Sequence, residues 1–332
     1  MSHKIAVIGA GSWGTTLALL LNKKGFEVCL WVFEAQQLAD MRSARENRQF
    51  LPGAPLPDTL QLTDNLSDAV AGRDFLVFAP PSHAMRGVCR ALRKDIREGQ
   101  VIVNVSKGIE NDSLMRMSEI IGEILPLPME NIATLYGPSH AEEVSREIAT
   151  AVVAASPSLS TARRVRDLFN TDYFRVYSST DIVGVECGGS LKNVVAIAAG
   201  ICDGAGFGDN TKAALLTRGL VEISRLGIAL GAQQETFAGL SGIGDLIVTC
   251  MSRHSRNRHV GEEIGKGRTL KDILGEMVMV AEGVKTTRSV HQLSKKLGVE
   301  LPISEQVYQV LFHDKSAHDA VEELMRRDPK EE

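Results

Sequence analysis

The chain has 332 residues, 44% of them hydrophobic and 23% charged, a composition typical of a folded globular protein at a length that favours two domains. Acidic residues outnumber basic ones by 41 to 37, which gives a net charge of −4 and excludes a global positive field for holding nucleic acid or an anionic membrane. Any basic binding site must therefore be local.

Short apolar runs alternate with longer amphipathic ones through about residue 178, a pattern typical of β-α units that build a mostly parallel sheet. A helix is predicted over Thr15–Lys24, after the first strand, and Gly25 suits the left-handed position that ends it. Strands are predicted at Lys4–Ile8, Glu27–Trp31, Phe75–Ala79, Val101–Asn104, Ile132–Leu135, Ala151–Ala155 and Phe174–Val176.

After the last of these strands the sequence becomes almost wholly helical. Asp181 is suited to cap a long helix, and the apolar stretch Val183–Ile201 within it carries two charged side chains, which favours a core helix over a membrane span. We therefore predict a Rossmann-type α/β domain over residues 1–180 and an all-α domain over residues 181–332.

The five cysteines show no spacing typical of metal or redox motifs, and most lie in apolar runs. We expect buried, reduced thiols in a cytoplasmic protein. His254 and His259 lack a carboxylate framework, so no metal site is expected.

A glycine-rich turn joins the first predicted strand to the helix that follows. Gly9, Gly11 and Gly14 would let the backbone turn sharply and approach a pyrophosphate, while the helix amides point at that anion. The alternative is a plain tight turn. The order of apolar strand, glycines and apolar helix favours a dinucleotide site.

Glu34 lies about 20 residues after Gly14, near the end of the second strand, where an acid accepts hydrogen bonds from the adenosine ribose. A carboxylate repels a 2′-phosphate, which favours NAD over NADP, and the neighbouring Phe33 supplies no positive charge. The alternative is a solvated carboxylate at a helix start.

Lys192 lies in an otherwise apolar, small-residue helix. Burial of a lysine is costly and favours its neutral amine, which can accept a hydroxyl proton and return it in the reverse reaction. The alternative is a lysine that extends along the protein surface until its charge reaches solvent.

Asp245 and Thr249 are four residues apart and share one face of a predicted helix that follows a glycine-rich segment. Asp245 either caps this helix or orients the lysine and the substrate. The local sequence leaves both interpretations open.

Ser255 is suited to cap a helix whose first turn carries Arg256 and Arg258. Positive charge at a helix start is unfavourable unless an anion lies there, and a phosphate would resolve the conflict. The alternative is a pair of arginines on a solvated face. Lys107, which follows a strand, is either a further cation for the anion or an ordinary loop lysine.

Several motifs, taken in order, resemble those of bacterial-type NAD(P)-dependent glycerol-3-phosphate dehydrogenases over nearly the whole chain. The resemblance implies a cytoplasmic, homodimeric oxidoreductase that interconverts dihydroxyacetone phosphate and sn-glycerol 3-phosphate and supplies phospholipid synthesis. The matching segments are Gly9–Gly14, Lys107–Gly108, Gly137–Ser139, Gly188–Asn193, Gly204–Gly208, Gly242–Asp245, Ser255–Asn257 and Val280–Gly283.

The resemblance also implies roles for the residues at matching positions. Lys192 would accept the proton, with Asn193, Asp245 and Thr249 around the reacting carbons. The substrate would contact Lys107, Gly137, Ser139, Lys192, Asp245, Ser255, Arg256 and Asn257. Together with the glycine turn and Glu34, the residues that border the dinucleotide would be Ser12, Trp13, Phe33, Lys107, Ala141, Arg256, Val280 and Glu282.

Two positions depart from the family pattern. Phe33 stands where relatives that use NADP carry arginine or histidine, so the choice between NADH and NADPH stays open. His140 replaces a phenylalanine, a change that we expect to affect packing more than chemistry.

Two other functions are compatible with parts of this pattern. One is a dehydrogenase of another small hydroxy acid on the same two-domain plan, and the other is a non-catalytic redox sensor that binds a dinucleotide. The set of Lys192, Asp245 and Arg256 favours an enzyme with a phosphate substrate. Neither a nucleic-acid partner nor membrane insertion is expected.

Overall fold

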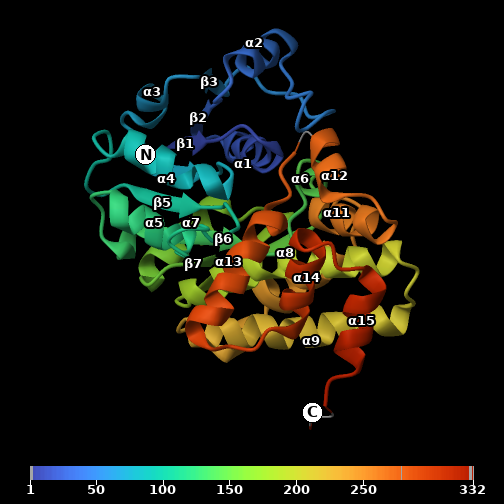
Figure 1. The fold of residues 1–332 in the computed structure, drawn as a ribbon. Coiled ribbons are helices and arrows are strands. Elements are labelled where there is room, and N and C mark those ends of the chain that lie inside the picture. Colours follow the sequence, from blue (N-terminus) through green and yellow to red (C-terminus); the bar gives the residue numbers. More distant parts are fainter. Residues whose placement is uncertain (1–2, 278, 329–330, 332) are drawn as a thin grey trace. The chain divides into compact units, whose positions relative to one another are not determined.

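A computed structural model describes residues 3–277, 279–328 and 331 (Figure 1). The chain divides into two compact units. The first unit comprises Met1–Lys107 and Met115–Glu186, and the second comprises Gly108–Leu114 and Cys187–Glu332. The division falls at residue 186 rather than at 180, inside a long helix, because the first turn of that helix packs with the sheet of the first unit.

One sheet of eight strands forms the centre of the first unit in the described part of the chain, in the order β3-β2-β1-β4-β5-β6-β7-β8. Neighbouring strands pair in parallel except β6 with β7, which confirms the predicted mostly parallel sheet. The strands are β1 (Lys4–Ile8), β2 (Glu27–Trp31), β3 (Gln61–Thr63), β4 (Phe75–Phe78), β5 (Val101–Asn104), β6 (Ile132–Tyr136), β7 (Thr150–Ala155) and β8 (Phe174–Ser179).

Among the strands of the described residues, β3 is the one that was not predicted from the sequence. It has three residues, two of them polar, and it lies at the edge of the sheet, where it pairs only with β2. An edge strand needs little burial, so its sequence carries no apolar run that would mark it.

The helices of the first unit cover both faces of this sheet (Figure 1). They are α1 (Ser12–Lys23), α2 (Ala35–Ala44), α3 (Leu66–Val70), α4 (Met85–Leu92), α5 (Met117–Ile124), α6 (Ala141–Val144) and α7 (Leu159–Phe169). Because side chains alternate along a strand, Ile5 and Val7 share a core with α1, α2 and α7, whereas Ala6 and Ile8 share the opposite core with α3, α4 and α5.

The described residues after 186 form helices joined by loops, with no strand among them, which confirms the predicted all-α part. Asp181 caps the long helix that leads into the second unit, as predicted, since its carboxylate accepts from the Gly184 amide at 2.8 Å. The helices are α8 (Ile182–Gly204), α9 (Asp209–Ala229), α10 (Asp245–Met251), α11 (Arg256–Gly265), α12 (Leu270–Glu276), α13 (Glu282–Leu297), α14 (Pro302–Phe312) and α15 (Ala317–Met325).

Helix α8 is long and apolar enough to cross a membrane by length and composition, but 94% of its apolar window is buried within the fold. It acts as a core helix, as the sequence predicts. Its packing against α11 is unusually close, because a Cβ at Gly200 would lie 1.9 Å from the Arg258 carbonyl oxygen and one at Gly261 would lie 2.0 Å from that of Ile197. These glycines let the two backbones touch and fix the start of α11 beside α8.

Candidate active site

The glycine turn lies where the strand order of the sheet reverses. Strand β1 has β2 on one side and β4 on the other, and ligands of open α/β sheets bind at the carboxyl ends of the strands beside such a point. Gly9 has a φ of +116°, and a Cβ there would lie 2.8 Å from the Ala79 carbonyl oxygen. A Cβ at Gly14 would lie 1.9 Å from the Gly9 carbonyl oxygen. The packing of the turn itself therefore requires both glycines.

Gly11 differs from these two, because a Cβ there would meet nothing within 4 Å. It occupies the N-cap position of α1, where no side chain caps the helix and the amides of Ser12 and Trp13 begin the first turn. Trp13 packs beside Ala141 at the start of α6. The turn thus presents helix amides to an open space, which fits the pyrophosphate of a dinucleotide.

Phe33 and Glu34 follow β2, next to the glycine turn, since the Gly9 amide donates to the Trp31 carbonyl oxygen at 3.2 Å. The Phe33 side chain is 72% exposed and its ring meets Trp31 edge-on. Glu34 is exposed at the N-cap position of α2, but its carboxylate does not cap that helix. The position alone is compatible with both interpretations of Glu34.

Lys107, Gly137 and Ser139 meet where β5 and β6 end. The Lys107 ammonium donates to the Gly137 carbonyl oxygen at 3.1 Å, and the Ser139 hydroxyl donates to the same oxygen at 3.0 Å. Gly137 has a φ of +152°, and a Cβ there would lie 2.9 Å from Cα of Val152, so the turn requires glycine. Three residues that the resemblance assigns to the substrate therefore lie together.

A buried polar network that was not predicted from the sequence lies beside this group. Asn104 donates to the Tyr136 hydroxyl at 2.9 Å and to the Glu186 carboxylate at 3.2 Å. Glu186 also accepts from Arg116 at 2.7 Å and from the Ser118 amide at 3.0 Å. The signal in the sequence is weak: a polar residue at the end of a strand and one carboxylate in an apolar helix.

In the second unit, Lys192 and Asp245 form a buried ion pair, with only 6% and 1% of their side chains exposed. The lysine also donates to the Thr249 hydroxyl at 2.5 Å, and that hydroxyl donates to the Asp245 carbonyl oxygen at 2.6 Å. The alternative in which Lys192 reaches solvent is therefore wrong. Asp245 is the first residue of α10 and contacts the lysine rather than capping the helix.

The register between α8 and the segment before α10 brings this pair together. A π-helical turn over Leu240–Gly244 leads into α10. A Cβ at Gly188 on α8 would lie 2.4 Å from the Ser241 carbonyl oxygen, and four residues further along each segment Lys192 meets Asp245. Gly188 thus allows the close approach of the two backbones that the ion pair needs.

Ser255 caps α11 as predicted, because its hydroxyl accepts from the Arg258 amide at 3.2 Å. The two arginines of this turn differ in exposure, since Arg258 is half-buried and Arg256 is exposed. Arg258 pairs with Asp203 at 2.9 Å and with Glu262 at 3.0 Å, so its charge is balanced within the fold. Arg256 is exposed at the helix start, the position at which the helix dipole favours a bound anion.

The starts of α11 and α13 lie side by side, because the Asn257 side-chain oxygen accepts from the Gly283 amide at 2.9 Å. A Cβ at Gly283 would also lie 2.7 Å from the Asn193 carbonyl oxygen, so α8 packs against the start of α13 as well. Glu282 begins α13, and Val280 precedes it with 36% of its side chain exposed. The predicted residues of the second unit are therefore gathered in one region.

No group of three or more His, Cys, Asp or Glu side chains that could hold a metal ion occurs in residues 3–277, 279–328 and 331. All five cysteines are buried, as predicted, and none of them forms a disulfide. Burial raises the pKa of Cys250, which lies next to Thr249, to about 12, so its thiol stays protonated. The chemistry available in this region is that of a lysine, a carboxylate and hydroxyls.

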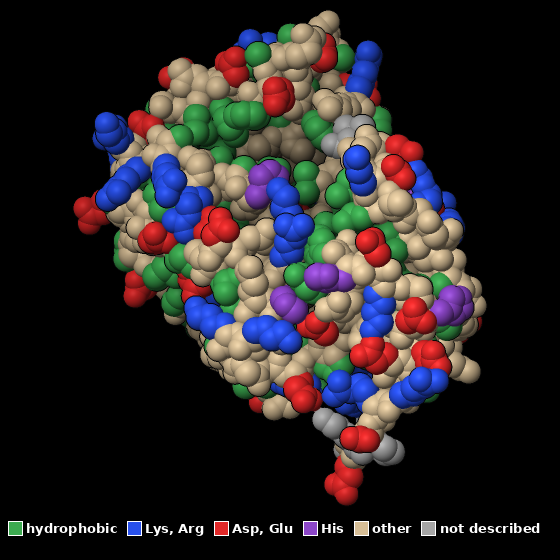
Figure 2. All heavy atoms as spheres, in the orientation of Figure 1, with side chains coloured by type: hydrophobic (Ala, Val, Ile, Leu, Met, Phe, Trp, Pro, Cys, Tyr) green, Lys and Arg blue, Asp and Glu red, His purple; other side chains and the backbone are tan. Residues whose placement is uncertain are grey.

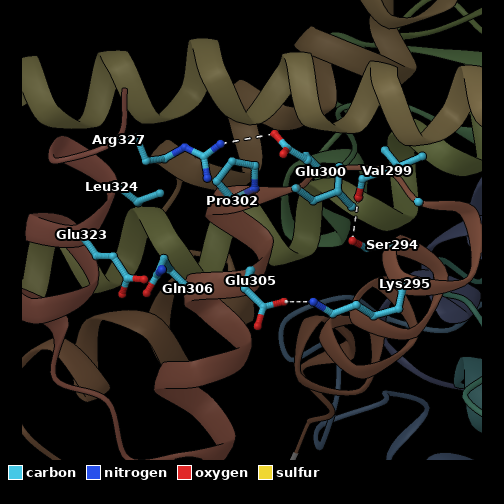
Figure 3. A pocket seen from close by; sticks show the side chains of 12 residues that line it. Ser294, Lys295, Val299, Glu300, Pro302, Glu305, Gln306, Glu323, Leu324 and Arg327 are labelled. Atoms are coloured by element: carbon cyan, nitrogen blue, oxygen red, sulfur yellow. Dashed lines mark hydrogen bonds and ion pairs between the residues drawn. The ribbon is translucent and has the colours of Figure 1, made fainter. Parts of the chain in front are cut away.

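A hollow formed by residues of α13, α14 and α15 and the segment between α13 and α14 contains none of the predicted site residues (Figure 3). Four of its charged side chains pair with one another, Lys295 with Glu305 at 3.9 Å and Arg327 with Glu300 at 3.3 Å. On the face of the protein in Figure 2, basic and acidic side chains are interspersed, in keeping with the small net charge.

Two family models match the chain. The one described as the N-terminus of NAD-dependent glycerol-3-phosphate dehydrogenase matches residues 4–162, and the one described as its C-terminus matches residues 181–322. Together they span both the glycine turn and the Lys192–Asp245 pair.

Full-length relatives and a solved structure agree with this match. Proteins named glycerol-3-phosphate dehydrogenase [NAD(P)+] from Citrifermentans bemidjiense and Chlorobium limicola are 57% and 54% identical, over 100% and 99% of this chain and 99% of each relative. The crystal structure of glycerol-3-phosphate dehydrogenase from Coxiella burnetii has a TM-score of 0.94 at 38% identity and covers 98% of this chain and 99% of its own. The chain therefore belongs to the NAD-dependent glycerol-3-phosphate dehydrogenase family.

Proposed function

We propose that this protein catalyses reversible hydride transfer between C2 of sn-glycerol 3-phosphate and C4 of a nicotinamide, with dihydroxyacetone phosphate as the oxidised partner. The observation that carries the proposal is the buried contact of Lys192 with Asp245 and Thr249 in a chain of this family. A buried lysine held by a carboxylate is suited to exchange a proton with a substrate hydroxyl.

The pyrophosphate and the adenosine of the dinucleotide would bind to the first unit. Gly9, Gly11 and Gly14 with the amides of Ser12 and Trp13 would hold the pyrophosphate, because Gly11 leaves open the space that a side chain would fill. Glu34 would accept from the adenosine ribose. When bound, the nicotinamide supplies or takes up the hydride. The further proposed contacts are Phe33, Lys107, Ala141, Arg256, Val280 and Glu282.

Lys192 would take the C2 hydroxyl proton as the alcohol is oxidised and return it in the reductive direction. Asp245 would orient the lysine, since it accepts from the lysine's amine, and Thr249 would fix that amine from a second side. Asn193, which follows the lysine on α8, would lie beside the reacting carbons. Burial of the pair excludes water, which strengthens each of these interactions.

Arg256 would bind the substrate phosphate together with the start of α11. Its guanidinium and the amides of the first turn offer charge-assisted hydrogen bonds, and Ser255 and Asn257 border the same helix start. Fixing the phosphate converts binding energy into orientation of the reacting carbon. Lys107, Gly137 and Ser139 are the proposed substrate contacts of the first unit.

Steady-state turnover with dihydroxyacetone phosphate and either NADH or NADPH tests this function. We expect turnover with both, and a catalytic efficiency on the order of tenfold higher with NADH, because Glu34 repels a 2′-phosphate and Phe33 offers it no cation. Consumption of neither cofactor would contradict the proposal. Turnover with other hydroxy acids alone would favour the rival dehydrogenase, and dinucleotide binding without any turnover would favour the redox sensor.

Arg256→Ala should raise the apparent KM for dihydroxyacetone phosphate by about tenfold to a hundredfold, because one charge-assisted contact to the phosphate is lost. The dissociation constant for NADH, measured by its fluorescence in the absence of substrate, should rise by a smaller factor than this KM, because Arg256 is only one of many proposed contacts of the dinucleotide. Arg218→Ala, a change of an exposed arginine on α9, is the matched control. An unchanged KM for the phosphate in Arg256→Ala would remove this residue from the phosphate site.

We also propose that the protein works in the cytoplasm as a homodimer and supplies glycerol phosphate for phospholipid synthesis. The full-length family relationship supports this proposal, as does the burial of the apolar helix α8 within the fold. Light scattering of the purified protein tests the dimer, and a mass equal to that of one chain would contradict it.

A further inference from the structure

We propose that Tyr136 is a positioning residue for Lys107, holding the lysine's ammonium at the point where it meets the substrate. The inference rests on the function proposed above and adds to it a residue that none of the predicted roles includes. Tyr136 is the last residue of β6, immediately before Gly137. It is a completely buried side chain, yet both its ring and its hydroxyl are directed to the segment that carries Lys107.

The first observation concerns the ammonium itself. The Lys107 Nζ atom lies 5.5 Å from the centre of the Tyr136 ring, within the range in which the face of an aromatic ring attracts a cation. The same atom donates to the Gly137 carbonyl oxygen at 3.1 Å. A flexible lysine side chain is thus held at its charged end by two adjacent residues, which lowers the entropy lost when it binds an anion.

The second observation concerns the backbone before the lysine. The Tyr136 hydroxyl donates to the carbonyl oxygen of Ser106, and the Ser106 amide donates to the Asn104 side chain at 3.0 Å. The Ser106 hydroxyl donates to the Pro80 carbonyl oxygen at 2.5 Å. Every polar group of Ser106 is therefore engaged. The residue that precedes Lys107 has a fixed backbone, and Tyr136 supplies one of its contacts.

Tyr136 is itself held in place by apolar packing and by a hydrogen-bond network. Ala155 on β7 and Ile182 and Val185 in the first turn of α8 share a hydrophobic cluster with it. Asn104, which donates to its hydroxyl, also donates to Glu186, and that carboxylate accepts from Arg116. Since a positioning group must be more rigid than the group that it positions, this packing is what the role requires.

A purely structural role makes a different prediction. If Tyr136 only filled the core, its loss would lower activity by the same factor whether or not Lys107 were present, because distant or unrelated effects multiply. If it acts through Lys107, its loss should have no further effect once the lysine is gone. A double-mutant cycle separates the two cases.

The cycle consists of Tyr136→Leu, Lys107→Ala and the double variant, assayed for kcat/KM with dihydroxyacetone phosphate. We expect about a tenfold loss in Tyr136→Leu, carried mainly by KM, and less than about a twofold further change when it is added to Lys107→Ala. Tyr136→Phe keeps the ring and should lose about threefold, which tests the ring apart from the hydroxyl and uses a variant that disturbs packing least. Equal factors in both backgrounds, or full activity of Lys107→Ala, would overturn the inference.

A second measurement does not depend on turnover. The rate at which acetic anhydride acetylates the Lys107 amine, followed by mass spectrometry of its peptide, should rise severalfold in Tyr136→Leu because the amine is no longer held against ring and carbonyl. Lys23, an exposed lysine of the same unit, serves as the internal reference. Phe169→Leu, which changes another completely buried aromatic side chain of this unit, should leave the Lys107 rate unaltered. If the Lys107 amine is acetylated at the same rate in Tyr136→Leu as in the wild type, the inference is contradicted even if activity falls. If the wild-type protein does not turn over dihydroxyacetone phosphate, the proposed function is contradicted instead.

Discussion

Lys192→Ala should lower kcat by about a hundredfold or more, while the protein still binds NADH, because the group that exchanges the C2 hydroxyl proton is gone. The lysine is 6% exposed and contacts Asp245 and Thr249, so bulk water has little access to this position to exchange the proton instead. The measurement is single-turnover reduction of dihydroxyacetone phosphate, with NADH binding followed separately by its fluorescence.

The substitution also leaves Asp245 buried without its partner, which costs on the order of 3 to 5 kcal/mol of folding free energy. Thermal unfolding must therefore show that Lys192→Ala is folded at the assay temperature. A small primary amine added to the assay should restore part of the lost rate, since it can occupy the space of the deleted side chain, whereas a general loss of structure would not respond.

Lys212→Ala is the matched control for this prediction. Lys212 lies on α9 in the same unit and also forms an ion pair, with Asp203 at 2.9 Å, but it belongs to none of the proposed contacts. Its loss should change kcat by less than about threefold, since a partly exposed pair contributes little. Near-normal turnover of Lys192→Ala would remove this lysine from the mechanism.

The fold was predictable from the sequence wherever a strand is buried on both faces or a helix carries a clear cap. Strands β1, β2 and β5 have the predicted bounds, and the apolar runs of β1 and β5 end at Gly9 and Asn104. The edge strand β3 was not predictable, since none of its three residues is buried and its sequence has no apolar run. The π-helical turn Leu240–Gly244 was also missed, because glycines there indicate a loop unless the facing helix is known.

The candidate site was predictable to the extent that its chemistry is local in sequence. The cap at Ser255 and the glycine turn follow from adjacent residues. The contact of Lys192 with Asp245 spans 53 residues, and without the family resemblance the sequence left open what the aspartate does. Tyr136 was not predictable, because its partners come from separate strands and its identity alone is that of a core aromatic.

The glycines of this family pattern have a physical reason that the sequence alone did not reveal. Gly188 faces Ser241, and Lys192 faces Asp245, at the same spacing of four residues along both segments. The position of the carboxylate is therefore set by how closely α8 approaches the turn before α10. A side chain at Gly188 should act on catalysis without touching substrate, cofactor or the reacting pair.

Gly188→Ala should lower kcat by about a hundredfold, because a Cβ that would lie 2.4 Å from the Ser241 carbonyl oxygen forces that backbone away, and a displacement of about 1 Å at a catalytic group has an effect of this size. NADH binding should persist, since the glycine turn belongs to the other unit. Gly275→Ala is the matched control, because it places the same methyl group in helix α12 of the same unit, where nothing lies within 4 Å. This variant should keep the wild-type kcat and gain about 0.5 to 1 kcal/mol of folding free energy. Normal turnover of a folded Gly188→Ala protein would mean that Asp245 reaches Lys192 even when α8 and the turn before α10 are forced apart. The close approach at Gly188 would then serve packing alone.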